Sequence, residues 1–204
     1  SYFNFNGVLG NDALRQAIQY AIDDETMCNV TVGGMYTAGC SVLPSSLPYG
    51  YDKLNDPWAY DPDKAAELLD SAGIVDTDGD GYRELDGEKI QLNYLAYSSR
   101  NLDEFAQAVA ITLESLGIGC KVTVQDYDTA LANQSAGNFD MITSNAIVVP
   151  TGDPTGFLGN FYSENSAAYG YYANDTYDAL YEQLLETTDQ DEQLGLIVQL
   201  QQVL

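Results

Sequence analysis

An acidic run in the middle of the chain has the residue types and spacing for metal chemistry. It reads DTDGDG at residues 76–81 and continues to Glu84. Alternate carboxylates followed by a glycine open the calcium loop of EF-hand proteins, where they converge on the ion. The final position of such a loop normally holds a bidentate glutamate, but here it is Gly87, and no EF-type helices flank the run. Two predictions stay open: a turn held by side-chain-to-backbone hydrogen bonds, or a calcium site whose ligands are Asp76, Asp78, Asp80 and Glu84.

Few residues are candidates for catalysis, because histidine is absent from the 204 residues. Its absence excludes Ser-His and Cys-His pairs as well as metal sites built on imidazole. The sequence also lacks a G-x-S-x-G nucleophile motif and a phosphate-binding loop. A carboxylate pair for glycoside hydrolysis cannot be picked out among 31 acidic residues. We therefore expect a protein that is not an enzyme and requires no cofactor.

Charge and cysteine content narrow the classes of partner. The 31 Asp and Glu against 7 Lys and Arg give a net charge of −24, a field that repels nucleic acid and anionic membrane surfaces. No apolar run approaches the roughly 18 residues of a membrane span. Cys28, Cys40 and Cys120 are an odd number without a C-x-x-C pair, which supports neither a zinc site nor a full disulfide framework. A Cys28–Cys40 bridge stays open.

One stretch, residues 89–126, must position the remaining elements. KIQLNYLAYSS alternates apolar and polar residues as a half-buried strand does, and IGCKVTVQDYD alternates in the same way. Between them, RNLDEFAQAVAITLESLG has apolar residues at helical spacing, Asn101 as its N-cap and Gly117 at its C-terminal end. Strand, helix and strand in this order form a βαβ unit with two parallel strands. The chain is therefore predicted to be an α/β domain.

The other elements are expected to pack on this unit. Between the second helix and Tyr60 lies a long loop rich in glycine and proline, and such loops are usually functional or held against something else. The predicted strands span residues 1–6 and 139–145, and the predicted helices begin near Asn11, Glu25, Asp61, Asp128, Asn174 and Asp189.

Three segments in order resemble one known family. NDALRQAIQYAID, the loop GGMYTAGCSVLPSSLPYG and the helix DPDKAAELLDSAG are similar to the extracellular solute-binding proteins of ABC importers for oligopeptides, dipeptides and nickel. The segment AIVVPTGDPTGFLGNF and the last two helices resemble the end of the same family's second lobe. In this family the DTDGDG run is common as a hairpin before a strand. The resemblance covers nearly all 204 residues.

The resemblance implies a fold, a role and partners. It implies an α/β, type II periplasmic-binding-protein-like lobe with a mixed, mostly parallel sheet flanked by helices. Residues 1–204 would be a single lobe, the second of a two-lobed protein, excised from a longer chain. The expected role is to capture a peptide or a related small solute outside the cell and to deliver it to ABC permease subunits. The expected location is extracellular or periplasmic, with a lipid anchor on the full-length protein, and the expected partners include the first lobe but no nucleic acid.

Ligand contacts are expected where parallel strands end and in the loops beyond them. The family's peptide-binding members commonly place a carboxylate for the peptide amine four residues before a proline, but here that position is Pro150, four residues before Pro154. Asp153 could replace the carboxylate or could cap a helix instead. The predicted ligand-binding residues are Tyr36, Tyr97, Ser98, Asn145, Thr151 and Asp153.

Two other functions stay open beside the solute-binding role. One is a calcium-stabilised extracellular surface module, and the other is a carboxylate-based glycoside hydrolase. Sensitivity of the melting temperature to EDTA would support the calcium module, and indifference would remove it. The sequence does not distinguish a peptide, a nickel chelate and a sugar as the solute.

Overall fold

A computed structural model describes residues 1–204, which fold into two compact units. One, here called the sheet unit, contains residues 1–38 and 58–144. The other, here called the helical unit, contains residues 39–57 and 145–204. No helix combines the length and apolar character that crossing a membrane requires.

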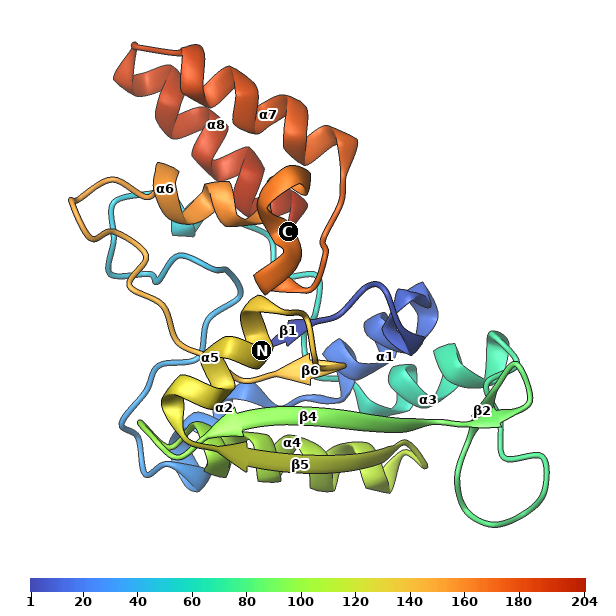
Figure 1. Cartoon of the computed structure of the whole chain (residues 1–204). Helices are drawn as coiled ribbons and strands as arrows, with labels where there is room; N and C mark the ends of the chain where they lie inside the picture. The colour runs from blue at the N-terminus through green and yellow to red at the C-terminus, as the bar shows by residue number, and fades with distance from the viewer. The chain divides into compact units, whose positions relative to one another are not determined.

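A four-stranded sheet organises the sheet unit, in the order β1 (Tyr2–Phe3), β6 (Met141–Ile142), β4 (Gln91–Tyr97) and β5 (Gly119–Gln125). β4 is parallel to both β5 and β6, and β1 is antiparallel to β6. The predicted βαβ unit and the mostly parallel mixed sheet are therefore confirmed. The connecting helix is α4 (Leu102–Ser115), which Figure 1 shows beside the long strands β4 and β5.

Helices bury both faces of the central strand. Leu92, Tyr94 and Ala96 of β4 join a core with residues of α1 (Asp12–Ala21), α3 (Pro62–Ser71) and α4. On the opposite face Tyr97 packs with Ala130 of α5 (Tyr127–Ser135), on the other side of the long strands from α4 (Figure 1). The prediction of a half-buried strand is thus wrong for the second half of β4, because Tyr94 to Tyr97 are all buried.

Capping side chains fix the N-terminal ends of several helices. The side chains of Asn11, Asp61 and Asp126 accept hydrogen bonds from backbone N–H groups in the first turns of their helices. The predicted short helix near Glu25 is α2 (Asp24–Thr26) continued by a single π-helical stretch, η2 (Met27–Thr31). The other short elements are η1 (Val8–Gly10) and the hairpin of β2 (Glu84–Leu85) and β3 (Glu88–Lys89).

Both short strands are briefer than predicted, because a mixture of backbone and Asn4 side-chain bonds replaces the regular ladder beyond them. The strand expected over residues 1–6 is only Tyr2–Phe3, and the one expected over residues 139–145 is only Met141–Ile142. Beyond them the Asn4 amide donates to the carbonyl oxygens of Gly137 and Phe139, at 2.9 and 2.7 Å. The Asn4 backbone N–H also donates to the Asp140 carbonyl at 2.8 Å, so the two segments remain hydrogen-bonded beyond the two-residue strands.

Aromatic side chains form the core of the helical unit. The ring of Phe161 contacts those of Phe157, Tyr169, Tyr172 and Tyr177 edge-on. Tyr169 and Tyr172, which belong to the tyrosine-rich segment 162–172, therefore take part in the packing of this unit. The elements of this unit are η3 (Tyr51–Lys53), α6 (Thr155–Leu158), η4 (Gly159–Phe161), η5 (Ser163–Tyr169), α7 (Asp175–Glu186) and α8 (Gln190–Val203).

The three cysteines are free thiols, so the Cys28–Cys40 disulfide that the sequence left open is not formed. Cys28 lies in the sheet unit and Cys40 in the helical unit. Burial raises the pKa of the Cys120 thiol to about 12. A thiol that stays protonated at neutral pH is a poor nucleophile and a poor metal ligand.

Candidate functional site

The carboxyl end of β4 is the first candidate region. Tyr97 ends the strand with only 4% of its surface exposed, and its ring meets Tyr127 edge-on with centroids 5.3 Å apart. Ser98 follows directly and is exposed. Of the two predicted ligand residues here, Ser98 is therefore accessible to a solute, whereas Tyr97 serves mainly as packing between β4 and α5.

Tyr36 reaches this same region from the long loop. Its hydroxyl donates a hydrogen bond of 2.7 Å to the backbone carbonyl of Arg100. Its ring packs edge-on against Phe105 of α4 at 5.6 Å, and 39% of the residue remains exposed. Two consecutive glycines with positive φ, Gly33 and Gly34, turn the chain between η2 and Tyr36. The structure thus brings Tyr36 beside the loop that contains Ser98.

Arg100 is the functional candidate that the sequence reasoning missed. Its guanidinium is exposed and makes no ion pair or hydrogen bond. The chain's other two arginines are both paired, Arg15 with Asp12 and Arg83 with Asp70. The signal was an arginine in the loop after the central strand, in a chain with only seven basic residues. An exposed, unpaired guanidinium can accept a planar anion such as a carboxylate through two parallel hydrogen bonds.

The backbone at this arginine is unusual. Arg100 and Asn101 both have positive φ, 55° and 58°. The Leu102 N–H donates to the Ser99 carbonyl at 3.1 Å, which closes a four-residue turn around them. Asn101 is the N-cap residue of α4, as predicted, but its side chain donates to Glu104 and does not cap the helix. Non-glycine residues in the left-handed region are costly and concentrate at functional sites.

The other three predicted ligand residues, Asn145, Thr151 and Asp153, belong to the helical unit and are exposed. The Asp153 carboxylate accepts hydrogen bonds from the backbone N–H and the hydroxyl of Thr155, at 2.9 and 2.7 Å. It therefore holds the start of α6, which is the structural alternative that the sequence left open for this residue. The Tyr49 hydroxyl donates to the Gly152 carbonyl and fixes the same loop.

The helical unit also has a cleft of about 410 Å³. It lies between the loop before η3 and α8, and it is lined by Ser45, Leu47, Pro48, Gly50, Tyr51, Asp52, Lys53 and Leu194. None of the six predicted ligand residues lines it.

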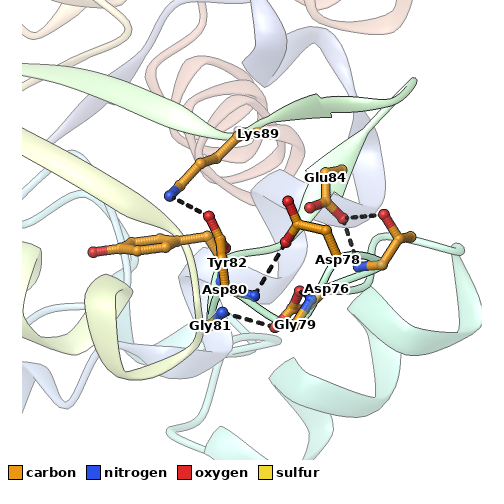
Figure 2. A network of polar contacts seen from close by, with 9 residues as sticks. Asp76, Asp78, Gly79, Asp80, Gly81, Tyr82, Glu84 and Lys89 are labelled. Carbon is orange, nitrogen blue, oxygen red and sulfur yellow. Dashed lines mark hydrogen bonds and ion pairs between the residues drawn. The ribbon is translucent and has the colours of Figure 1, made fainter.

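The acidic loop is a network of short hydrogen bonds, drawn in Figure 2. The Asp76 carboxylate accepts from the N–H groups of Gly79 and Gly81, at 2.7 and 2.8 Å. Asp80 accepts from the Tyr82 N–H and pairs with the Lys89 ammonium at 2.8 Å, and this hydrogen bond from Lys89 is the main reason why the pKa of Asp80 is lowered. These bonds confirm the prediction of a turn held by side-chain-to-backbone contacts.

The same loop has a donor set that suits a hard cation. One carboxylate oxygen from each of Asp76, Asp78, Asp80 and Glu84 lies within 4.8 Å of the others. Calcium prefers oxygen ligands of this kind, so the residues fit the ion. Glu84 is also engaged by the Thr77 N–H at 2.8 Å, and Asp78 by the Asp80 N–H at 3.1 Å. Because each of these carboxylates already has a donor, the turn does not require a metal, and calcium binding stays a prediction.

Comparisons with known proteins agree on one family. The family model described as bacterial extracellular solute-binding proteins, family 5 middle, matches residues 1–169. The nickel-binding periplasmic protein of Escherichia coli K12 is 28% identical over 152 residues, which are 72% of this chain and 28% of that protein.

Solved structures agree with this match. The oligopeptide-binding protein AppA of Bacillus subtilis, in complex with a nonapeptide, superposes with a TM-score of 0.88 at 21% identity, over 99% of this chain and 41% of that one. NikA of Brucella suis, in complex with Fe(III)-EDTA, gives 0.83 at 27% identity, over 98% and 41%. The chain therefore spans less than half the length of each of these three relatives.

Proposed function

Because the chain belongs to family 5 of the bacterial extracellular solute-binding proteins, we propose that it forms part of the substrate-binding component of an ABC importer. In this role it captures a peptide or a related small solute outside the cell and delivers it to the membrane permease. The observation that carries the proposal is the family match over residues 1–169. The fold, a type II periplasmic-binding-protein-like lobe, supports it.

The fraction of each related chain that this chain covers supports a two-lobed protein. It corresponds to 41% of the AppA and NikA chains that it superposes on. We propose that residues 1–204 are the second lobe and that a first lobe closes on it around the solute by a hinge motion. The permease would then recognise the closed form. A lipid anchor on the full-length protein belongs to the same proposal.

The solute is proposed to meet the sheet unit at the carboxyl end of β4. Open α/β sheets bind ligands at this edge, and here it presents the exposed Ser98, Tyr36 and the unpaired Arg100. In a chain of net charge −24, an anionic group is repelled everywhere except beside an uncompensated cation. Among the cations without an ion pair, Arg100 is the one that follows the carboxyl end of β4, and we assign it as the group that receives a carboxylate of the solute. Relatives include proteins named for binding glutathione and oligopeptides, which are solutes with carboxylates.

Three of the predicted ligand residues lie in the helical unit. Asn145 and Thr151 are exposed and offer an amide and a hydroxyl. The Asp153 carboxylate is committed to Thr155, so its replacement of the family's amine-binding carboxylate would require that bond to be shared. Members of the matched family are binding proteins, and the chain's lack of histidine fits binding without catalysis.

The test is calorimetric titration of the protein that contains this chain with trialanine, glutathione and a nickel–histidine complex. The 204-residue chain alone is the control for the first lobe. Saturable binding of one solute by the longer protein, and much weaker binding by the chain alone, is the expected result. Tight binding by the chain alone would contradict a shared site between two lobes, and no binding of any solute by either would contradict the proposed solute class.

A further inference from the structure

Tyr36 lies against the turn that carries Arg100, and we infer that it is a positioning residue for this arginine. Its hydroxyl holds the backbone of the turn Ser99–Leu102 in the left-handed conformation, which directs the guanidinium toward an anionic group of the solute. The inference rests on the proposed function, because it takes Arg100 as the group that receives a carboxylate. It adds a residue 64 positions away in the sequence that acts on the solute through Arg100.

The turn Ser99–Leu102 has a backbone conformation that its own residues do not favour. A hydrogen bond from the Leu102 N–H to the Ser99 carbonyl, with positive φ at both central residues, is the pattern of a type I′ turn. Such turns strongly prefer Asn-Gly or Gly-Gly at their centre. Here the central residues are Arg100 and Asn101, and arginine has no intrinsic tendency toward positive φ. The conformation therefore persists only because surrounding contacts impose it.

Tyr36 makes a contact of the required kind. The carbonyl that accepts its hydroxyl at 2.7 Å is that of Arg100, which belongs to the peptide group between the two central residues of the turn. A change to a turn with negative φ values rotates this peptide, so the bond opposes that change directly. The tyrosine is itself fixed, because its ring packs on Phe105 of α4 and its loop is tied by a bond of 2.9 Å from the Gly34 N–H to the Cys28 carbonyl.

The orientation of Arg100 matters because acidic residues follow it immediately. Asp103 and Glu104 lie in the first turn of α4, and Glu104 already accepts from the Asn101 amide at 3.1 Å. A relaxed turn would let the guanidinium pair with one of these carboxylates, and such a pair competes with the solute. In the observed turn Arg100 has neither acid as a partner. Tyr36 thus keeps the arginine available.

The experiment compares two solutes that differ in one charge. The longer protein is titrated with trialanine, which has a free carboxylate, and with trialaninamide, which does not. In Tyr36→Phe the ring remains and only the hydroxyl is lost. We expect a roughly three- to tenfold loss of trialanine affinity, the value of one hydrogen bond, with no change for trialaninamide. Tyr60→Phe is the matched control, because the Tyr60 side chain is 53% exposed and its hydroxyl makes no hydrogen bond.

A rescue variant separates positioning from general stability. Asn101→Gly makes the left-handed turn intrinsically favourable, so adding it to Tyr36→Phe should restore trialanine affinity. The Nε–H signals of the three arginines give a second readout: trialanine should shift the Arg100 signal and leave those of Arg15 and Arg83 in place.

The outcomes distinguish the inference from the proposed function. If the wild-type protein binds trialanine but Tyr36→Phe binds it equally well, Tyr36 does not position Arg100. Equal losses for both solutes, or no rescue by Asn101→Gly, would also overturn the inference while the solute-binding role stands. If the wild-type protein binds neither peptide, the proposed peptide solute fails and the inference fails with it.

Discussion

Two tight loops of the sheet unit both contain residues with positive φ, but the types of these residues differ. In the acidic loop the left-handed positions are Gly79 and Gly81, with φ of 83° and 95°, and the carboxylates are bonded within the loop. In the turn after β4 the left-handed positions are Arg100 and Asn101, and the guanidinium has no partner. Glycine is the inexpensive choice where only a turn is needed. The positive φ at Arg100, together with its unpaired charge, supports the proposed role of this side chain in binding.

Substitution at the glycine beside the acidic loop should have the largest effect on stability. Gly117 has φ of 76°, and an added Cβ would lie 3.0 Å from the Gly81 carbonyl oxygen. We expect Gly117→Ala to lower the free energy of unfolding by about 1–3 kcal/mol, as measured by urea denaturation. Gly195→Ala, in α8 with open space around it, is the control and should not destabilise. If Gly117→Ala left the free energy of unfolding unchanged, a positive φ at a non-glycine residue would not be costly here. A positive φ would then be weaker evidence that the turn at Arg100 is strained.

Removal of the first carboxylate of the acidic loop should come next. Asp76→Ala removes the acceptor of two backbone N–H groups, and we expect a loss of about 1–2 kcal/mol in the free energy of unfolding. Glu67→Ala, at an exposed acid in α3, is the control. Solute affinity should be unchanged in both variants. A solute affinity that falls in Asp76→Ala would place this loop in the binding site and remove the contrast between the two loops.

The arginine turn should respond with the opposite sign. Arg100→Gly relieves the positive φ, and we expect the free energy of unfolding to rise by about 0.5–1 kcal/mol after the entropy cost of glycine is subtracted. Affinity for a solute carboxylate should fall in the same variant, because the guanidinium is gone. Thermal unfolding and titration with trialanine measure the two quantities. A variant that is less stable than the wild type would show that the turn is not strained.

Chelation tests whether the stability of the acidic loop depends on a bound metal ion. Because its carboxylates already have donors, we expect EDTA to leave the melting temperature unchanged. Millimolar calcium should raise it by no more than magnesium does. A calcium-specific rise that Asp78→Asn abolishes would establish the predicted metal site, since ligand binding to the folded state stabilises it by mass action.

Acid titration should give the smallest effect. The hydrogen bond from Lys89 lowers the pKa of Asp80, so this carboxylate stabilises the fold above its unfolded pKa near 3.9, and the contribution is lost as pH falls through the lower folded value. Lys89→Gln should raise the pKa of Asp80 toward its ordinary value, as measured by NMR titration. An unchanged pKa would mean that the ion pair seen in Figure 2 does not form in solution.

Much of the fold was predictable because its signals are local. The parallel pair β4 and β5, the N-caps Asn11 and Asp61, and the glycine that ends α4 follow from periodicity and capping rules. The burial of β4 on both faces was not predictable from its alternation, because Leu95 and Tyr97 are covered by segments distant in the sequence.

The candidate site was predictable only in part. Ser98 was proposed from the rule that loops beyond strand ends bind ligands, and Tyr36 from the long loop rich in glycine and proline. The role proposed for Arg100 depends on a positive φ and on a bond to a residue 64 positions away, and a single sequence shows neither. Asn101 illustrates the same limit: its type predicted a capping side chain, but the left-handed backbone directs its amide to Glu104.

The most direct test of the central claim is the affinity of the longer protein for trialanine before and after Arg100→Gln. The account predicts saturable binding by the wild type and a loss of about tenfold or more in the variant, the value of a hydrogen bond to a charged group, with an unchanged melting temperature. Saturable binding that Arg100→Gln leaves intact would contradict the assigned binding edge. No binding by the wild type would contradict the proposed peptide solute itself.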